Sequence, residues 1–403
     1  ALHHAAIALE NGECDAALVG AVNLICSPMN SMAYYDAGML SKSGACHAFD
    51  ARADGFVRGE GAAMILLKSL EQALDDGDSI YALVAGTAVN HGGQASSLTA
   101  PRPDAQAVVI RRAWDKSGIS GATVQYVETH GTGTVLGDPV EAAGLASALN
   151  DAGHDGGGCG LGAVKSNIGH LEVAAGLAGL LKVALALQNR MFPGQPDFSM
   201  KNPHIDFSAS PLYVVDKNEP WPENHDRDGR PVARRAGLSA FGFGGANAHA
   251  VLEEYPGCCF QKNASAFSGD REVVVLSART GQQLRERMES LVRYLDYAPG
   301  TSLHDLAHTL QTGREPMDVR FGATVGGLDE LRAKLLRTLD GWEEARGRDW
   351  TDSTGRATAP AKGSGITDAS ADVEEVLELW RGGGEIRPNP NHFLVRRLFL
   401  STY

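Results

Sequence analysis

The chain has 403 residues, of which 43% are hydrophobic and 21% charged, and its formal net charge is -13 at pH 7. This length allows two or more domains, each with its own core, and the composition is that of an ordinary globular protein. The negative charge argues against nucleic-acid binding, because phosphate backbones attract clusters of Lys and Arg that this sequence lacks.

The six cysteines show neither metal-ligand spacing nor a disulfide framework. We therefore expect reduced, structural thiols in a cytoplasmic protein with no metal site. They are Cys14, Cys26, Cys46, Cys159, Cys258 and Cys259. No signal peptide or membrane role is expected either. The longest apolar stretch, residues 171–187, carries two charged residues and falls short of the roughly 20 residues of a bilayer span.

Strand and helix patterns alternate along the first 254 residues, which predicts a layered α/β core. Gly12 and Gly118 are placed to end helices. Asp138, Pro139 and Glu141 have the spacing of an N-cap, a first-turn proline and a capping box. Helices are expected at 1–11, 69–76 and 105–117, from 138 onward and from 171 onward, and strands at 16–26, 62–67, 81–89, 126–129, 161–166, 236–241 and 248–253.

A second unit is predicted after a connector at residues 255–271. Residues 272–345 combine strands at 273–276 and 319–325 with leucines at helical spacing, which indicates a small α/β domain. Residues 346–372 are rich in Gly, Ala, Ser, Thr and Asp and read as a flexible linker. Residues 373–403 are predicted to form a last helix and an extended tail.

Two histidines follow predicted strands in glycine-bracketed turns. His130 lies in VETHGTGT (residues 127–134), and His170 lies in VKSNIGHLE (residues 164–172). Imidazoles on two rigid turns could converge on one oxygen and stabilise negative charge developing there. A third segment, FGFGGANAH (residues 241–249), offers the mobile glycine-rich backbone that such a pocket often needs.

A nucleotide-binding turn, and with it a nicotinamide-dependent oxidoreductase, is the rival interpretation of residues 131–137. Their spacing is GxGxxxG rather than GxGxxG, and no acidic ribose ligand follows. Cofactor titration would decide between the two.

Several segments, in this order, resemble the β-ketoacyl synthases of modular polyketide synthases. They are FDARADGFVRGEG (residues 49–61), LTAP (98–101), the two histidine motifs and residues 236–254. The resemblance covers residues 1–254 and implies a thiolase-like αβαβα core. It also implies polyketide chain elongation, by decarboxylative Claisen condensation of acyl and malonyl thioesters carried on an acyl carrier protein. No bound cofactor is implied, because phosphopantetheine arrives on the carrier.

The resemblance assigns catalytic roles to three residues. His130 and His170 match the two histidines that polarise the malonyl thioester carbonyl and stabilise the enolate. Lys165 matches the active-site lysine, which would orient the second histidine, with Glu172 as a possible partner. A structural ion pair is the alternative for this lysine.

The same resemblance assigns substrate contacts to three further residues. Thr132 and Thr134 match positions that contact the phosphopantetheine arm, and Phe243 matches the gating residue whose backbone N–H helps to form an oxyanion hole. We interpret two other polar residues of these motifs, Asn247 and His249, as structural. In the segment at residues 49–61, we interpret Asp54, Arg58 and Glu60 as a buried polar network.

The chain also departs from the family pattern. The family's nucleophilic cysteine comes shortly before a segment that matches residues 1–5, so we expect it ahead of Ala1 and expect this chain to be a truncated ketosynthase, inactive in condensation by itself. Residues 272–345 resemble the linker domain of such enzymes, and residues 395–403 resemble the post-linker that packs back on the ketosynthase.

The expected partners follow from the same resemblance. No GxSxG acyltransferase elbow is present, which favours an acyltransferase acting in trans. Other expected partners are the acyl carrier protein, further polyketide synthase modules and, for the complete enzyme, a second copy in a homodimer. A non-catalytic scaffold or carrier-docking piece stays open as an alternative, as does a fatty-acid-type ketosynthase, which the linker domain disfavours.

Overall fold

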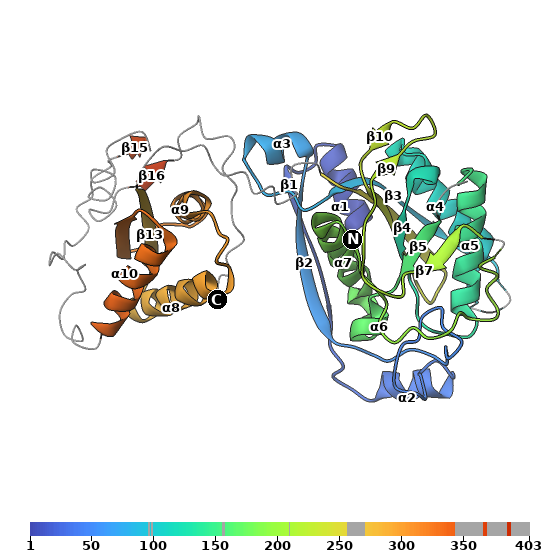
Figure 1. Cartoon of the computed structure of the whole chain (residues 1–403). Helices are drawn as coiled ribbons and strands as arrows, with labels where there is room; N and C mark the ends of the chain where they lie inside the picture. Colours follow the sequence, from blue (N-terminus) through green and yellow to red (C-terminus); the bar gives the residue numbers. More distant parts are fainter. Residues whose placement is uncertain are drawn as a thin grey trace. The chain divides into compact units, whose positions relative to one another are not determined.

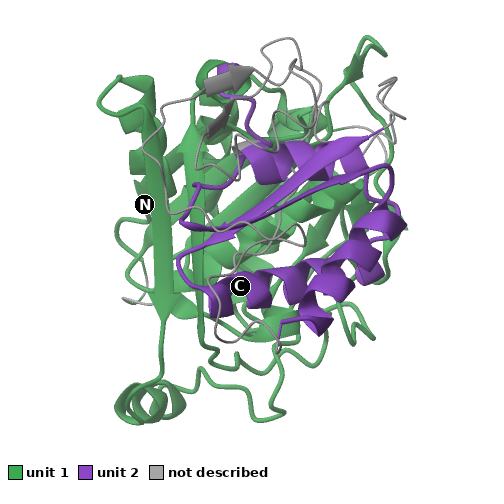
Figure 2. Ribbon diagram, turned by 90° about the vertical axis from the view of Figure 1, so that its left-hand side faces the viewer, with its two compact units in different colours: residues 1–74, 80–260 green, residues 75–79, 261–403 purple. Residues whose placement is uncertain are grey.

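The computed structural model describes residues 1–95, 97, 100–154, 158–208, 210–255, 271–342, 366–368 and 385–387. The chain divides into two compact units, which are green and purple in Figure 2. Unit 1 comprises residues 1–74 and 80–260, and unit 2 comprises residues 75–79 and 261–403.

A six-stranded sheet with the order β3-β12-β11-β4-β5-β7 forms the centre of unit 1 (Figure 1). β12 runs opposite to the other five strands. The carboxyl ends of β3, β11, β4 and β5 therefore meet at one edge of the sheet. The strands are β3 Leu83–His91, β4 Tyr126–Glu128, β5 Cys159–Gly162, β7 Leu212–Val214, β11 Arg235–Phe241 and β12 Ala246–Glu253.

Helices cover both faces of this sheet, because successive strand residues point to opposite sides. Val127 packs in a core with Ile110 of α4 (Pro103–Ser117) and Leu145 of α5 (Gly137–Asp151). Its neighbour Tyr126 packs in a second core with Leu180 of α7 (Ala175–Asn189).

A second, two-stranded sheet completes the layers of unit 1. β1 (Ala16–Asn23) and β2 (Gly61–Lys68) pair antiparallel, and Ile65 of β2 packs against the core that contains α7. The layers thus run helix, sheet, helix, sheet (Figure 1).

The remaining elements of unit 1 are short. The sequence prediction missed α2, whose side chains are nowhere buried and therefore show no apolar periodicity. These elements are α1 Leu2–Glu10, α2 Met29–Asp36, α3 Leu70–Asp75, α6 Lys165–Ile168, β6 Met191–Phe192, β8 Glu219–Pro220, β9 Asn224–His225 and β10 Pro231–Val232, with 3-10 turns at Gly121–Thr123 and Glu172–Ala174.

The capping box predicted at Asp138 is wrong. Helix α5 begins at Gly137, and its N-cap residue is Leu136, which makes no side-chain capping bond. Asp138 and Glu141 turn inward instead and accept backbone N–H groups from other loops. The strand predicted over 161–166 also ends early, at Gly162, because the Val164 N–H donates to Glu128 rather than to a neighbouring strand.

Unit 2 is built on an antiparallel pair, β13 and β14, with three helices packed along it (Figure 2). Leu306 and Leu331, two of the leucines at helical spacing, are fully buried. Thr280 and Ser302 cap the first two helices by accepting backbone N–H groups. The elements are β13 Glu272–Ala278, α8 Gly281–Tyr297, α9 Leu303–Thr312, β14 Val319–Val325 and α10 Leu328–Asp340.

A short parallel pair, β15 (Ile366–Asp368) and β16 (Glu385–Arg387), falls within the predicted linker and tail. The predicted last helix and residues 395–403 lie outside the described residues. Within the described part of the chain, no helix combines the length and apolar character needed to cross a bilayer.

Candidate active site

A cavity of about 1060 Å³ opens at the sheet edge where β3, β11, β4 and β5 end. The turns after these parallel strands carry the motifs that the sequence singled out, so the topology itself brings distant motifs together. All six predicted site residues line the cavity: His130, Thr132, Thr134, Lys165, His170 and Phe243.

The two histidine rings lie next to each other in this cavity. Their centroids are 5.5 Å apart, and their planes make an angle of 81°. Burial, reinforced by the Lys165 charge, lowers the pKa of His170 to about 3 and holds the pKa of His130 well below its ordinary value. Both imidazoles are therefore neutral at pH 7.

The surroundings of His170 fix which of its nitrogens carries the proton. The Glu172 backbone N–H donates to Nδ1 at 2.9 Å, so Nδ1 is an acceptor and the proton resides on Nε2. The backbone of His170 bonds on both sides to the neighbouring segment, donating to Val57 O and accepting from Gly59 N. The Phe56 ring packs edge-on against the imidazole, with a centroid distance of 5.1 Å.

Two glycines and one carboxylate shape the turn that carries His130. The Glu141 carboxylate accepts the N–H groups of His130 and Gly131 at 2.7 and 2.8 Å. Gly131 and Gly133 have φ values of +39° and +72°. A Cβ on Gly133 would lie 2.9 Å from the His47 backbone nitrogen, so only glycine fits there.

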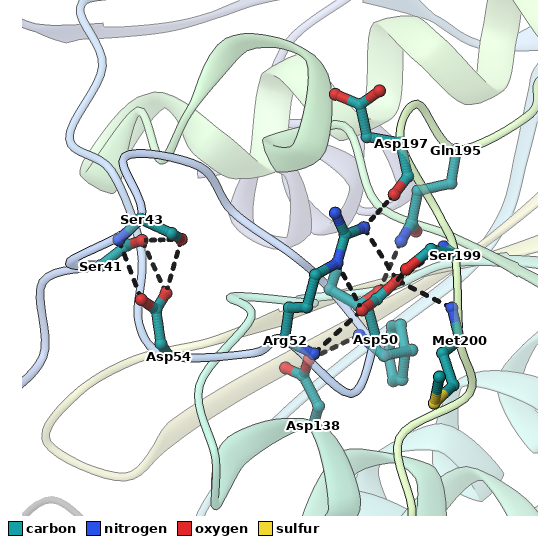
Figure 3. Close-up of polar contacts among 12 residues, drawn as sticks. Ser41, Ser43, Asp50, Arg52, Asp54, Asp138, Gln195, Asp197, Ser199 and Met200 are labelled. Carbon is teal, nitrogen blue, oxygen red and sulfur yellow. Dashed lines mark hydrogen bonds and ion pairs between the residues drawn. The ribbon is translucent and has the colours of Figure 1, made fainter.

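A network centred on Asp50 supports this turn from the segment at residues 49–61 (Figure 3). Asp50 accepts hydrogen bonds from the Arg52 guanidinium and the Ser199 backbone N–H. Burial opposes its ionisation, but these bonds outweigh burial and hold its pKa well below the usual range. The adjacent Phe49 N–H donates to Asp138 at 2.7 Å, which ties the segment to α5.

Comparison with known protein families matches three consecutive stretches. The beta-ketoacyl synthase N-terminal domain matches residues 1–73, its C-terminal domain residues 81–199, and the ketoacyl-synthetase C-terminal extension residues 202–325. The ketosynthase domain of oxazolomycin biosynthesis from Streptomyces albus JA3453 is 35% identical, with a TM-score of 0.86 over 100% of this chain and 67% of that one. This chain belongs to the β-ketoacyl synthases of modular polyketide synthases.

Other relatives agree with this assignment. Polyketide synthase PksN of Bacillus subtilis is 42% identical over 358 residues, which make up 86% of this chain but 6% of that protein. The ketosynthase from module 6 of the bacillaene synthase of the same species is 39% identical, with a TM-score of 0.76 over 84% of this chain and 57% of that one. The ketosynthase chain thus spans a small part of the curated synthases that it matches, and its fold is the thiolase-like α/β fold.

The carboxylates around Lys165 of this ketosynthase differ from the sequence expectation. Lys165 is buried, and burial lowers its pKa although Glu128 and Glu141 favour its charge. Glu172, its predicted partner, forms an ion pair with Arg58 instead. Glu128 was not among the predicted site residues, and its signal was its position at the end of β4, two residues before His130.

The predicted substrate contacts lie at the cavity wall. The hydroxyls of Thr132 and Thr134 are 3.1 Å apart, and Thr134 also accepts the Gly137 N–H. Phe243 is 56% exposed on the turn between β11 and β12. His91, which was not a predicted site residue either, bonds through Nε2 to the Gly244 carbonyl of this same turn.

Proposed function

We propose that this chain acts in polyketide chain elongation by binding a malonyl thioester in the cavity and stabilising the enolate formed on decarboxylation. The pair of neutral histidines carries the proposal, with ring centroids 5.5 Å apart and the Nε2 proton of His170 free to be donated. A thioester oxygen that becomes negatively charged is the group that such fixed donors stabilise.

The chemistry breaks the bond between the malonyl methylene carbon and its carboxylate. Carbon dioxide leaves, and the electron pair passes into the thioester as an enolate. The enolate carbon then attacks an acyl thioester, which forms a carbon–carbon bond and expels a thiolate. Neutral histidines suit this step, because a cationic ring would also bind the carboxylate and so stabilise the ground state.

The partners in this proposal follow from the relatives, which are multi-module polyketide synthases. We propose that the substrates arrive on the phosphopantetheine arm of an acyl carrier protein, with Thr132 and Thr134 as hydroxyl partners for its amides and Phe243 as the gate. In the same proposal, the acyltransferase acts in trans, the ketosynthase is a cytoplasmic homodimer, and residues 272–345 are its linker domain.

The test is release of labelled carbon dioxide from malonyl-pantetheine, a reaction in which the enolate is quenched by a proton and acetyl-pantetheine results. We expect His170→Ala to slow this release about 100- to 1000-fold, the usual loss for one oxyanion donor. His225→Ala is the control, because His225 is exposed on β9.

Two outcomes contradict the proposal. One is equal carbon dioxide release by His170→Ala and the unsubstituted chain. The other is binding of the carrier protein without any release, which favours a docking piece of the synthase.

A further inference from the structure

Glu172 has an unusual backbone conformation next to His170. Its φ is +46°, in the left-handed region, where a residue other than glycine loses about 1–2 kcal/mol. In this conformation its backbone N–H donates to Nδ1 of His170. The hydrogen bond that sets the His170 tautomer therefore depends on the strained backbone of Glu172, and this backbone conformation needs stabilising contacts from other residues.

Arg58 contacts both Glu172 and His170, the first through its side chain and the second through its backbone. Its guanidinium forms an ion pair with the Glu172 carboxylate and donates to the Ser31 hydroxyl at 2.6 Å. The same guanidinium lies over the Tyr34 ring, 5.4 Å from its centroid. The side chains of Arg58 and Glu172 are only 7% and 17% exposed, so water screens the pair weakly. The backbone of Arg58 also forms an isolated parallel β-bridge with the backbone of His170.

We propose that Arg58 is a positioning residue that holds Glu172 in its left-handed conformation and thereby keeps the proton of His170 on Nε2. The proposal rests on the proposed function, since it assigns a purpose to that proton. Without the ion pair, Glu172 can relax to a negative φ and withdraw its N–H from Nδ1. The ring can then place its proton on Nδ1, and Nε2 would present a lone pair to the thioester oxygen and repel it.

Arg58→Met tests this idea, because methionine fills similar space without the charge or the donors. Nitrogen-15 NMR of histidine-labelled protein reports the tautomer directly. We expect a single Nε2–H form of His170 in the unsubstituted chain and a mixture in Arg58→Met. Carbon dioxide release should fall about tenfold in rate with little change in KM. Arg58→Lys, which keeps the charge, should recover part of both. Arg111→Met, which removes a surface ion pair with Asp151, is the matched control.

Glu172→Gly separates positioning from packing. Glycine keeps the backbone N–H and adopts a positive φ without strain. The double variant Arg58→Met with Glu172→Gly should therefore release carbon dioxide faster than Arg58→Met alone. It also avoids the unpaired, largely buried carboxylate that the single variant leaves.

An unchanged tautomer and rate in Arg58→Met would overturn the proposal, as would a double variant no faster than the single one. Failure of the proposed function gives a different result. The unsubstituted chain would then release no carbon dioxide, while the NMR comparison would still report whether Arg58 sets the tautomer.

Discussion

Glu128 is a buried carboxylate whose two oxygens both have polar partners. It is fully buried at the end of β4, accepts the Tyr126 hydroxyl and the Val164 N–H, and forms an ion pair with Lys182 at 2.8 Å. A buried charge is tolerated when it has such partners. Val164 is the N-cap residue of α6, so its bond to Glu128 helps to position Lys165, and both Glu128 and Lys165 line the cavity.

His249 is a buried histidine that makes the stability of the folded chain depend on pH. Its Nδ1 lies 3.0 Å from the Ser239 hydroxyl, its ring packs on Gly237, and burial lowers its pKa to about 3. Between pH 6.5 and 3 the unfolded chain binds a proton here that the folded chain does not. The contribution of His249 to stability is therefore full above pH 6.5 and is lost as the pH falls.

Comparison with His249→Gln isolates this contribution. Between pH 7 and pH 5 the unsubstituted chain should lose about 2 kcal/mol more free energy of unfolding than the variant, because pH 5 lies about 1.5 pH units below the pKa of the unfolded histidine and each unit contributes about 1.4 kcal/mol. Urea unfolding at the two pH values measures the difference. Parallel stability curves would show that the buried ring is already protonated when folded.

At the scale of elements, the parallel run of β3, β11, β4 and β5 explains why the site lies where it does. The turns at this edge pass close to neighbouring segments of the chain, and a glycine permits such a close approach because it has no Cβ. Gly133 lies in such a turn, whereas Gly118 ends α4 in open space.

These two glycines form a matched pair for substitution by alanine. Both have φ near +70°, so each substitution costs about 1–2 kcal/mol of backbone strain. Only Gly133→Ala adds a clash with the His47 backbone, so it should destabilise the chain more and also slow carbon dioxide release. Denaturant unfolding and the release assay check this, and equal effects of the two variants would contradict it.

At the scale of the whole molecule, the two units have separate cores. Leu145 is fully buried in unit 1 and Leu306 is fully buried in unit 2. Separate cores of this kind are expected to unfold as separate units.

Leucine-to-alanine substitutions test this separation. Each should destabilise its own unit by about 2–5 kcal/mol, because a cavity replaces the side chain. Hydrogen exchange followed by mass spectrometry should show faster exchange in 271–342 for Leu306→Ala and in α4 and α5 for Leu145→Ala. Loss of protection across both units from either variant would indicate one cooperative structure.

The sequence alone was sufficient for the strand and turn that present His130, because apolar runs and glycines act over a few neighbouring residues. It also indicated a strand before His170, but not the end of that strand at Gly162 or the short helix α6 that follows. The resemblance then indicated the family and the cavity residues.

Only the tertiary structure determined the partners of the charged groups. Arg58 reaches Glu172 across 114 residues, and Asp138 accepts the Phe49 N–H across 89. The family resemblance had suggested Glu172 as a possible partner of Lys165, and local spacing had predicted a helix cap at Asp138. Burial decided otherwise, because a carboxylate removed from water takes whichever donors the packed chain brings to it.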